Sequence, residues 1–207
     1  MSYKTEQESF WAGEFGNNYI DRNDNKELIA SNAVLFSSIL KRTGATKSII
    51  EFGANIGMNL KAIELLRPNA KLSAIEINAQ AVTELKKNQN IEVFHDSILS
   101  YSPEKAYDLC FIKGVLIHIN PEDLTTVYQA LYRSSSRYIC VIEYYNPTPV
   151  EVPYRGHAGK LFKRDFAGEM LDMFKDLTLV DYGFVYHRDT AYPKDDLNWF
   201  LLEKKAK

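Results

Sequence analysis

The sequence contains few cysteines and no arrangement typical of a metal site. Only two cysteines occur among its 207 residues, Cys110 and Cys140, and each stands inside an apolar run. We therefore expect buried thiols rather than a disulfide, as in proteins of a reducing compartment. No Cys/His cluster has the spacing of a zinc site, so no metal is expected.

Long apolar runs and an excess of one charge are also missing. No apolar stretch approaches the roughly 20 residues that a membrane helix requires. The polar residues 1–8 are unlike a signal peptide. The formal net charge of −2 provides no basic field that would attract nucleic acid. These features indicate a cytoplasmic protein with a small-molecule substrate and no membrane contact. They argue against nucleic-acid binding and leave the oligomeric state open.

The chain is long enough for one α/β domain, because 45% of its residues are hydrophobic. From residue 48 to about residue 145, β-like and helix-like segments alternate, which is typical of a parallel sheet with crossover helices. The predicted strands are 48–53, 71–77, 91–95, 107–113 and 138–145, and the predicted helices are 57–67, 79–88 and 121–134. A helix over 165–174 and an antiparallel pair of strands over 177–187 and 197–203 are expected to follow.

The most informative segment is residues 48–57, Ser-Ile-Ile-Glu-Phe-Gly-Ala-Asn-Ile-Gly. An apolar run ends at Glu51, and a turn with Gly53 and Gly57 follows. Glycines there permit a tight turn and let backbone amides approach a ligand. Glu76 ends the next apolar run, about twenty residues further on, where an acidic side chain can accept hydrogen bonds from both ribose hydroxyls. The pattern predicts a site for a cofactor that contains a nucleoside.

The turn differs from that of a dinucleotide site, which would read G-x-G-x-x-G. Here Asn55 replaces the second glycine and crowds a pyrophosphate, while the Glu51 carboxylate suits a cationic ligand. Over about residues 45–145 the chain resembles the class I S-adenosylmethionine (SAM)-dependent methyltransferases. The resemblance implies SAM as the cofactor and a Rossmann-like α/β fold, with a mostly parallel seven-stranded sheet, an antiparallel edge pair and helices on both faces. Residues 1–44 would form a helical lid or cap, and residues 45–207 the SAM-binding domain.

Other functions fit parts of this pattern. An NAD-dependent dehydrogenase uses a similar turn, but Asn55 and the missing third glycine count against it. A non-catalytic module that senses SAM is a further possibility, since fold does not fix function. Methylation of RNA or of a peptide is the main alternative within methyl transfer, and the acidic charge balance argues mildly against RNA.

The N-terminal segment 8–23 carries aromatic residues separated by glycine and asparagine. One interpretation is an aromatic staple that holds the first helix on the sheet. The other is a lid in which Trp11 and Tyr19 enclose the sulfonium and Arg22 pairs with the methionine carboxylate. The pattern Phe-Trp-x-Gly-x-Phe-Gly-x-x-Tyr-Ile-x-Arg-Asn resembles the methyltransferases associated with pseudaminic acid biosynthesis. The similarity continues through residues 51–57 and into Tyr-Tyr-Asn-Pro-Thr-Pro.

The resemblance to methyltransferases also assigns roles to later residues. Cofactor-binding positions beyond the glycine turn would be Glu76, Ile77, Asp96, Ser97, Ile98 and Lys113, of which Asp96–Ile98 would meet the adenine. His118 is a natural general base because histidine titrates near neutral pH, and Glu143 and Tyr144 are alternatives in no defensible order.

The loop 143–164 is the expected acceptor site. It sets potentially cationic side chains among tyrosines, a combination that can bind a carboxylate or phosphate. The predicted substrate-binding residues are Tyr145, Asn146, Tyr154, Arg155, His157 and Lys160. Together these observations predict transfer of a methyl group from SAM to a small polar acceptor, anionic in character, such as a sugar, an amino acid or a nucleotide sugar.

Overall fold

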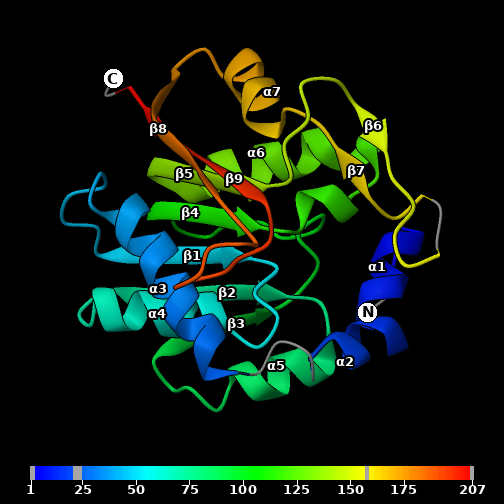
Figure 1. Ribbon diagram of the computed structural model, residues 1–207, viewed down its shortest axis with the longest axis horizontal. Coiled ribbons are helices and arrows are strands. Elements are labelled where there is room, and N and C mark those ends of the chain that lie inside the picture. Colours follow the sequence, from blue (N-terminus) through cyan, green and yellow to red (C-terminus); the bar gives the residue numbers. More distant parts are fainter. Residues whose placement is uncertain (1–2, 21–24, 157–158, 206–207) are drawn as a thin grey trace.

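A seven-stranded sheet forms the centre of the molecule, in the order β3-β2-β1-β4-β5-β9-β8 (Figure 1). The computed structural model describes residues 3–20, 25–156 and 159–205. Adjacent strands from β3 to β5 run parallel, and β9 runs antiparallel to both β5 and β8. This arrangement confirms the predicted sheet with its antiparallel edge pair. The strands are β1 Ser48–Phe52, β2 Lys71–Glu76, β3 Ile91–His95, β4 Tyr107–Lys113, β5 Ser135–Glu143, β8 Leu177–Val185 and β9 Leu197–Lys204.

The helices differ from the predicted segments mainly at their ends. The helices are α1 Glu6–Ala12, α2 Glu14–Ile20, α3 Lys26–Leu40, α4 Met58–Leu66, α5 Ala79–Leu85, α6 Leu124–Ser134 and α7 Phe166–Met173. The predicted helix 121–134 begins as a short 3-10 turn, Pro121–Asp123, and a second such turn covers Leu116–His118. A small hairpin, β6 Val150–Glu151 and β7 Phe162–Lys163, lies within the proline-broken loop after β5. Among the described residues, no helix combines the length and the apolarity needed to cross a membrane.

Two apolar cores hold helices against the two faces of the sheet. Successive strand residues point to opposite faces, so Ile49 joins the core with α3, α4 and α5, whereas Ile50 joins the core with α6 and α7. Strands buried on both faces explain the continuous apolar runs in the sequence. Helix α3 belongs to this framework, because Phe36 and Ile39 at its end are fully buried.

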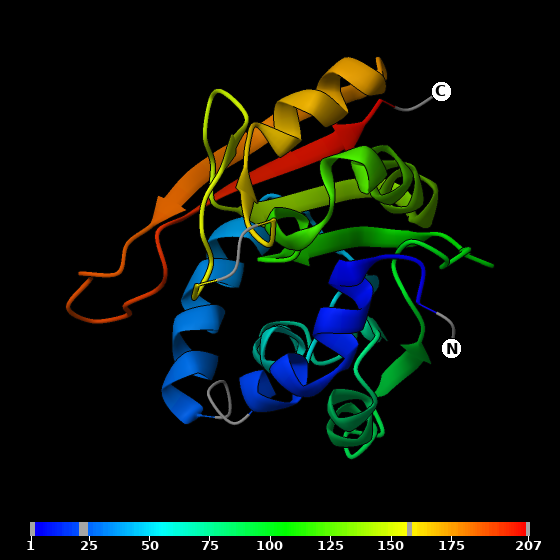
Figure 2. The same cartoon turned by 90° about the vertical axis from the view of Figure 1, so that its right-hand side faces the viewer.

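The first two helices lie apart from these layers. Figures 1 and 2 show α1 and α2 beyond the carboxyl ends of the parallel strands, near the loop that carries β6 and β7. A hydrogen bond joins α1 to this loop, since Gln7 Nε2 donates to the Gly159 carbonyl oxygen at 3.2 Å. In doubly wound sheets ligands bind at this edge. The N-terminal helix pair, α1 and α2, therefore covers the edge where a ligand is expected.

Candidate functional site

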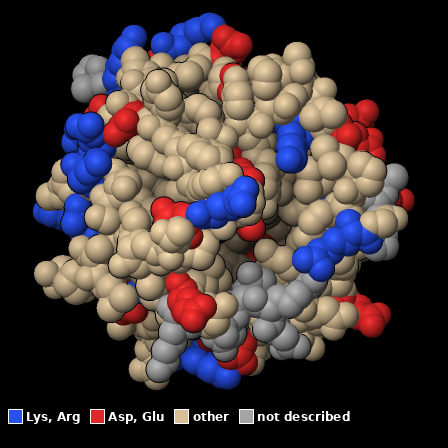
Figure 3. Space-filling model, viewed as in Figure 1, with Lys and Arg blue, Asp and Glu red and all other residues tan. Residues whose placement is uncertain are grey.

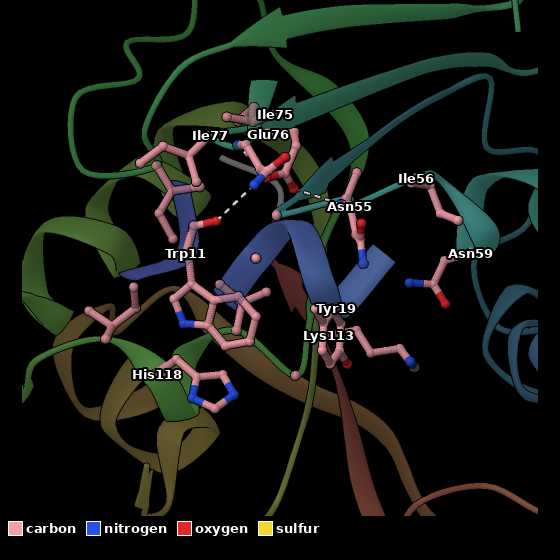
Figure 4. Close-up of a pocket in the computed structure, with 18 of the residues that line it drawn as sticks. Trp11, Tyr19, Asn55, Ile56, Asn59, Ile75, Glu76, Ile77, Lys113 and His118 are labelled. Atoms are coloured by element: carbon pink, nitrogen blue, oxygen red, sulfur yellow. Dashed lines mark hydrogen bonds between the residues drawn. The ribbon is translucent and has the colours of Figure 1, made fainter. Parts of the chain in front are cut away.

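A cavity of about 510 Å³ opens at the carboxyl ends of the parallel strands, beneath the N-terminal helix pair (Figure 4). Its volume lies within the range of about 300–1,000 Å³ that small-molecule sites occupy. Many residues predicted as cofactor-binding line it, together with one predicted base. They are Trp11, Tyr19, Gly53, Asn55, Glu76, Ile77, Asp96, Ser97, Ile98, Lys113 and His118. The structure thus brings together residues that stand more than a hundred positions apart in the sequence.

The turn after β1 needs its glycines for both backbone and packing reasons. Gly53 and Gly57 have φ angles of 74° and 77°, in the left-handed region that side chains disfavour. A Cβ atom on Gly53 would also lie 2.7 Å from a methyl carbon of Val115. Asn55 has φ 48° and is one of the non-glycine residues that tolerate this region. The turn therefore packs closely against the segment that follows β4.

Glu76 presents a carboxylate to the cavity from the end of β2. Its Oε2 accepts from the Asn55 backbone amide and its Oε1 from the Asn78 amide, each at 2.7 Å. Burial raises the pKa of Glu76, and these amides oppose that shift. Each carboxylate oxygen keeps a further lone pair for a ligand hydroxyl. The site is therefore pre-formed for two hydroxyl donors.

Glu51 lies beneath the turn and does not line the cavity. Its Oε1 accepts from Asn59 Nδ2 at 2.6 Å, and Oε2 has no hydrogen-bond partner among the described residues. Burial raises its pKa to about 8, although Asn59 and Lys113 oppose the shift. Gly57 also stays outside the lining. The predicted direct contacts of Glu51 and Gly57 with a ligand remain predictions, while Asn59 lines the cavity and was missed.

The segment after β3 forms a closed turn at one end of the cavity. Asp96 Oδ1 accepts from the Ser97 amide and from Ser100 Oγ, both at 2.7 Å. The Asp96 amide donates to the Glu76 carbonyl oxygen at 3.1 Å, which ties this turn to β2. Ile98 is 8% exposed and offers an apolar surface. An acidic group beside an apolar side chain suits a planar, polar-edged ring.

Asn78 connects β2 to the N-terminal helix pair. Its Nδ2 donates to the Trp11 carbonyl oxygen at 3.1 Å and to Asn17 Oδ1 at 2.8 Å. Its Oδ1 accepts from the amides of Gln80 and Ala81, both at 3.0 Å, and so caps α5. Asn78 is not among the predicted site residues, although an asparagine just before a predicted helix is an N-cap signal.

His118 closes the cavity on the side of the 3-10 turn after β4. Its ring lies 4.7 Å from the Trp11 ring and 4.9 Å from the Tyr154 ring, between centroids. Its Nδ1 is 2.6 Å from the Lys160 carbonyl oxygen. A carbonyl only accepts, so Nδ1 carries the proton and Nε2 keeps a lone pair. Burial lowers the pKa of His118 to about 4, and the ring is neutral at neutral pH.

Glu143 and Tyr144, the alternative bases, do not line the cavity. Glu143 Oε1 accepts from the amides of Val115 and Leu116, at 2.9 and 2.8 Å, and so holds the turn that carries His118. Burial raises the pKa of Glu143 to about 7, and burial together with Asp195 raises that of Tyr144. The geometry gives Glu143 a positioning role.

Among the described residues, the predicted acceptor residues of the loop 143–164 are not part of the cavity lining. Tyr145 is 40% exposed and packs near Phe200, and Asn146 Nδ2 donates within its own turn to Thr148. Lys160 Nζ pairs with Glu6 at 3.2 Å. Tyr154 packs behind His118, with Arg155 over its outer face. Two other predicted residues lie outside the described residues: Arg22 and His157.

The loop between β8 and β9, rather than the loop 143–164, contributes to the cavity lining. Its lining residues include His187, Lys194 and Asp195. Lys194 is only 7% exposed, and burial, together with Lys113, lowers its pKa to about 7. The predicted antiparallel pair of strands indicates that the loop between β8 and β9 lies at the cavity, because the start of β9 must lie beside the carboxyl end of β5. Among the described residues, no three His, Cys, Asp or Glu side chains gather as metal ligands.

Comparison with known proteins identifies the fold. No protein-family model matches the sequence, and no curated protein matches it. A 1,6-didemethyltoxoflavin-N1-methyltransferase from Burkholderia thailandensis superposes with a TM-score of 0.71 at 13% identity, over 100% of this chain and 92% of that chain. Magnesium protoporphyrin IX methyltransferase from Synechocystis PCC 6803 gives 0.69 at 10% identity, over 97% and 100%. A plantazolicin methyltransferase gives 0.67 at 15% identity, over 97% and 95%.

These three neighbours were solved with S-adenosylhomocysteine (SAH) bound. The chain has the Rossmann-like fold of class I methyltransferases, as the sequence predicted. The narrower resemblance to the methyltransferases associated with pseudaminic acid stays a prediction.

Proposed function

We propose that this protein transfers a methyl group from SAM to a small polar acceptor. The carboxylate of Glu76 carries the proposal, since it stands in the cavity with both oxygens oriented by the amides of Asn55 and Asn78. It is suited to the two ribose hydroxyls of an adenosine. The presence of SAH in three proteins of the same fold supports this ligand.

The other residues of the cavity fit the remaining parts of SAM. Asp96 and Ile98 provide a polar and an apolar contact for adenine, and Lys113 provides a cation near the methionine end. The rings of Trp11 and Tyr19, 5.4 Å apart between centroids, offer π-faces to a sulfonium. When bound, SAM supplies a methyl group on a positively charged sulfur, and transfer leaves SAH.

The chain mainly contributes positioning, exclusion of water and, for some acceptors, removal of a proton. Trp11 and Tyr19 place the N-terminal helix pair against the cavity, and we expect the pair to exclude water from it. His118 Nε2 holds the lone pair that can accept a proton from an acceptor hydroxyl or ammonium. Because burial keeps the ring neutral, this base is ready at neutral pH.

The form of the cavity favours a small acceptor. RNA or a peptide would have to displace α1 and α2, because Trp11 of α1 and Tyr19 of α2 line the cavity. On the face drawn in Figure 3, Lys and Arg side chains form separate groups with Asp and Glu among them, rather than one basic track. Small-molecule methylation agrees best with both observations.

Isothermal titration calorimetry with SAH tests the proposal. We expect SAH to bind and NAD to give no heat. Glu76→Gln should weaken SAH binding about 10- to 100-fold, the effect of losing hydrogen bonds to a charged group. Glu92→Gln is the matched control, because this carboxylate on β3 is half exposed and pairs with Lys105. Heat with NAD but none with SAH would overturn the proposal.

A further inference from the structure

Two lysines face the same end of the cavity. Lys113 ends β4, and Lys194 comes from the loop between β8 and β9. Within the described part of the chain, no carboxylate oxygen lies within 4.0 Å of either ammonium group. Lys194 is also 93% buried, judged from its 7% exposure. A buried ammonium without a close counter-ion is costly, so a ligand with negative charge would stabilise the pair.

The acids around the two lysines do not neutralise them. Glu51, Glu143 and Asp195 are the carboxyl groups that act on Lys113. Burial raises the pKa of Glu51 to about 8 and that of Glu143 to about 7, so these two carboxyl groups are weak counter-charges at neutral pH. Lys113 and Lys194 repel one another, and this repulsion adds to the burial that lowers the pKa of Lys194. The local charge balance favours an incoming anion.

The order of the strands indicates which part of the bound molecules lies there. Asp96 and Gly53 follow β3 and β1, Glu76 ends β2, and under the proposed function these three residues hold the adenosine. Lys113 ends β4, the next strand in the sheet, where the methionine part would end. Lys194 precedes β9, which lies beyond β5, on the side of the sheet away from β3. It therefore stands on the side of the cavity that remains for the acceptor.

We propose that Lys113 and Lys194 form a subsite for the carboxylate of an acidic acceptor. The inference rests on the proposed function and names its substrate class: a small acid that places its carboxylate between the two ammonium groups. It relocates the anion site expected in the loop 143–164, because Lys160 pairs with Glu6 and does not line the cavity.

Lysine side-chain NMR on the SAH-loaded protein tests this subsite. The chain is labelled with ¹³C at lysine Cε, the Lys194 signal is assigned with Lys194→Arg, and acetate is added as the probe, with acetamide as its uncharged counterpart. We expect acetate to shift the Lys194 signal and to raise its titration midpoint by about one pH unit, a tenfold change in proton affinity. Acetamide should leave both unchanged. Lys113→Met should weaken the response to acetate, whereas Lys160→Met should preserve it.

The carboxylate of the cofactor itself could occupy the same subsite. A second experiment distinguishes the cofactor carboxylate from that of an acceptor. The Lys194 signal is compared in protein saturated with SAH and with 5′-methylthioadenosine, which lacks the amino-acid part. If SAH alone moves the signal, methylthioadenosine does not, and acetate adds nothing, the carboxylate is that of the cofactor and the inference is wrong. No response to acetate in either sample also overturns it. Calorimetry on the same samples reports SAH binding separately, so a failure of the proposed function is recognised by itself.

Discussion

At the scale of single residues, His118 links stability to pH. Its pKa is about 4 in the folded chain against 6.5 for a free histidine, so the unfolded state takes up the proton first. Stability is therefore lost as pH falls from 6.5 to 4, by up to about 3 kcal/mol. We expect His118→Asn to be less stable than the wild type at pH 7 and to lose this pH dependence.

Urea unfolding of both proteins at pH 7 and pH 4.5 measures the difference. The free-energy gap between wild type and His118→Asn should shrink toward acid. A gap that stays constant would show that His118 has the same pKa in the folded and the unfolded chain, so burial would not be what keeps the proposed base neutral.

Glu51 has the opposite dependence. Its pKa in the fold, about 8, exceeds the ordinary value of 4.5, so the unfolded state ionises first as pH rises. Stability contributed by the protonated carboxyl is present at low pH and is lost between 4.5 and 8. Glu51→Gln keeps an oxygen for Asn59 and cannot ionise. Its melting temperature should exceed that of the wild type by a few degrees at pH 8 and by less at pH 5. Equal differences at both pH values would contradict the raised pKa.

At the scale of elements, Asn78 performs two separable tasks, and substitutions can divide them. Asn78→Asp keeps the oxygen that caps α5 but loses the donor to Trp11 and Asn17. Asn78→Ala loses both. We expect faster amide hydrogen exchange in α1 and α2 for both variants, and faster exchange at the start of α5 only for Asn78→Ala. Unchanged exchange in α1 and α2 would show that the aromatic contacts and the Glu6–Lys160 ion pair hold the N-terminal helix pair without Asn78.

Most elements of the sheet could be predicted because their sequence signals are local. Runs such as 48–53 and 71–77 are apolar on both faces, and the glycine turn between β1 and α4 has its own residue pattern. The loop 186–196 has no such pattern, and only the antiparallel placement of β9 brings Lys194 to the cavity. The basic loop 143–164 was predicted as the acceptor site from its charges and its tyrosines. Its charges are visible in sequence, but their partners, such as Glu6 for Lys160, are set by tertiary contacts.

At the scale of the whole molecule, different contacts hold the sheet with its covering helices and the N-terminal helix pair. Both large cores consist of residues from α3 onward, and none of the described residues 3–20 belongs to them. The helix pair is instead attached by Asn78, by the ion pair of Glu6 with Lys160, and by rings around Trp11. Attachments of this kind can open without unfolding the sheet. We expect such opening to give a ligand its route into the cavity.

The two tryptophans of the chain allow this separation to be tested. Trp11→Ala removes contacts with His118 and Tyr19 at the cavity, so SAH should associate and dissociate about tenfold faster, with little change in the ligand-free melting temperature. Trp199→Phe alters a core residue that is 7% exposed, and it should lower the melting temperature by several degrees while leaving SAH exchange rates unchanged. Stopped-flow binding and thermal unfolding measure both effects. If Trp11→Ala melts as early as Trp199→Phe, the helix pair is part of the folding core and cannot gate the cavity independently.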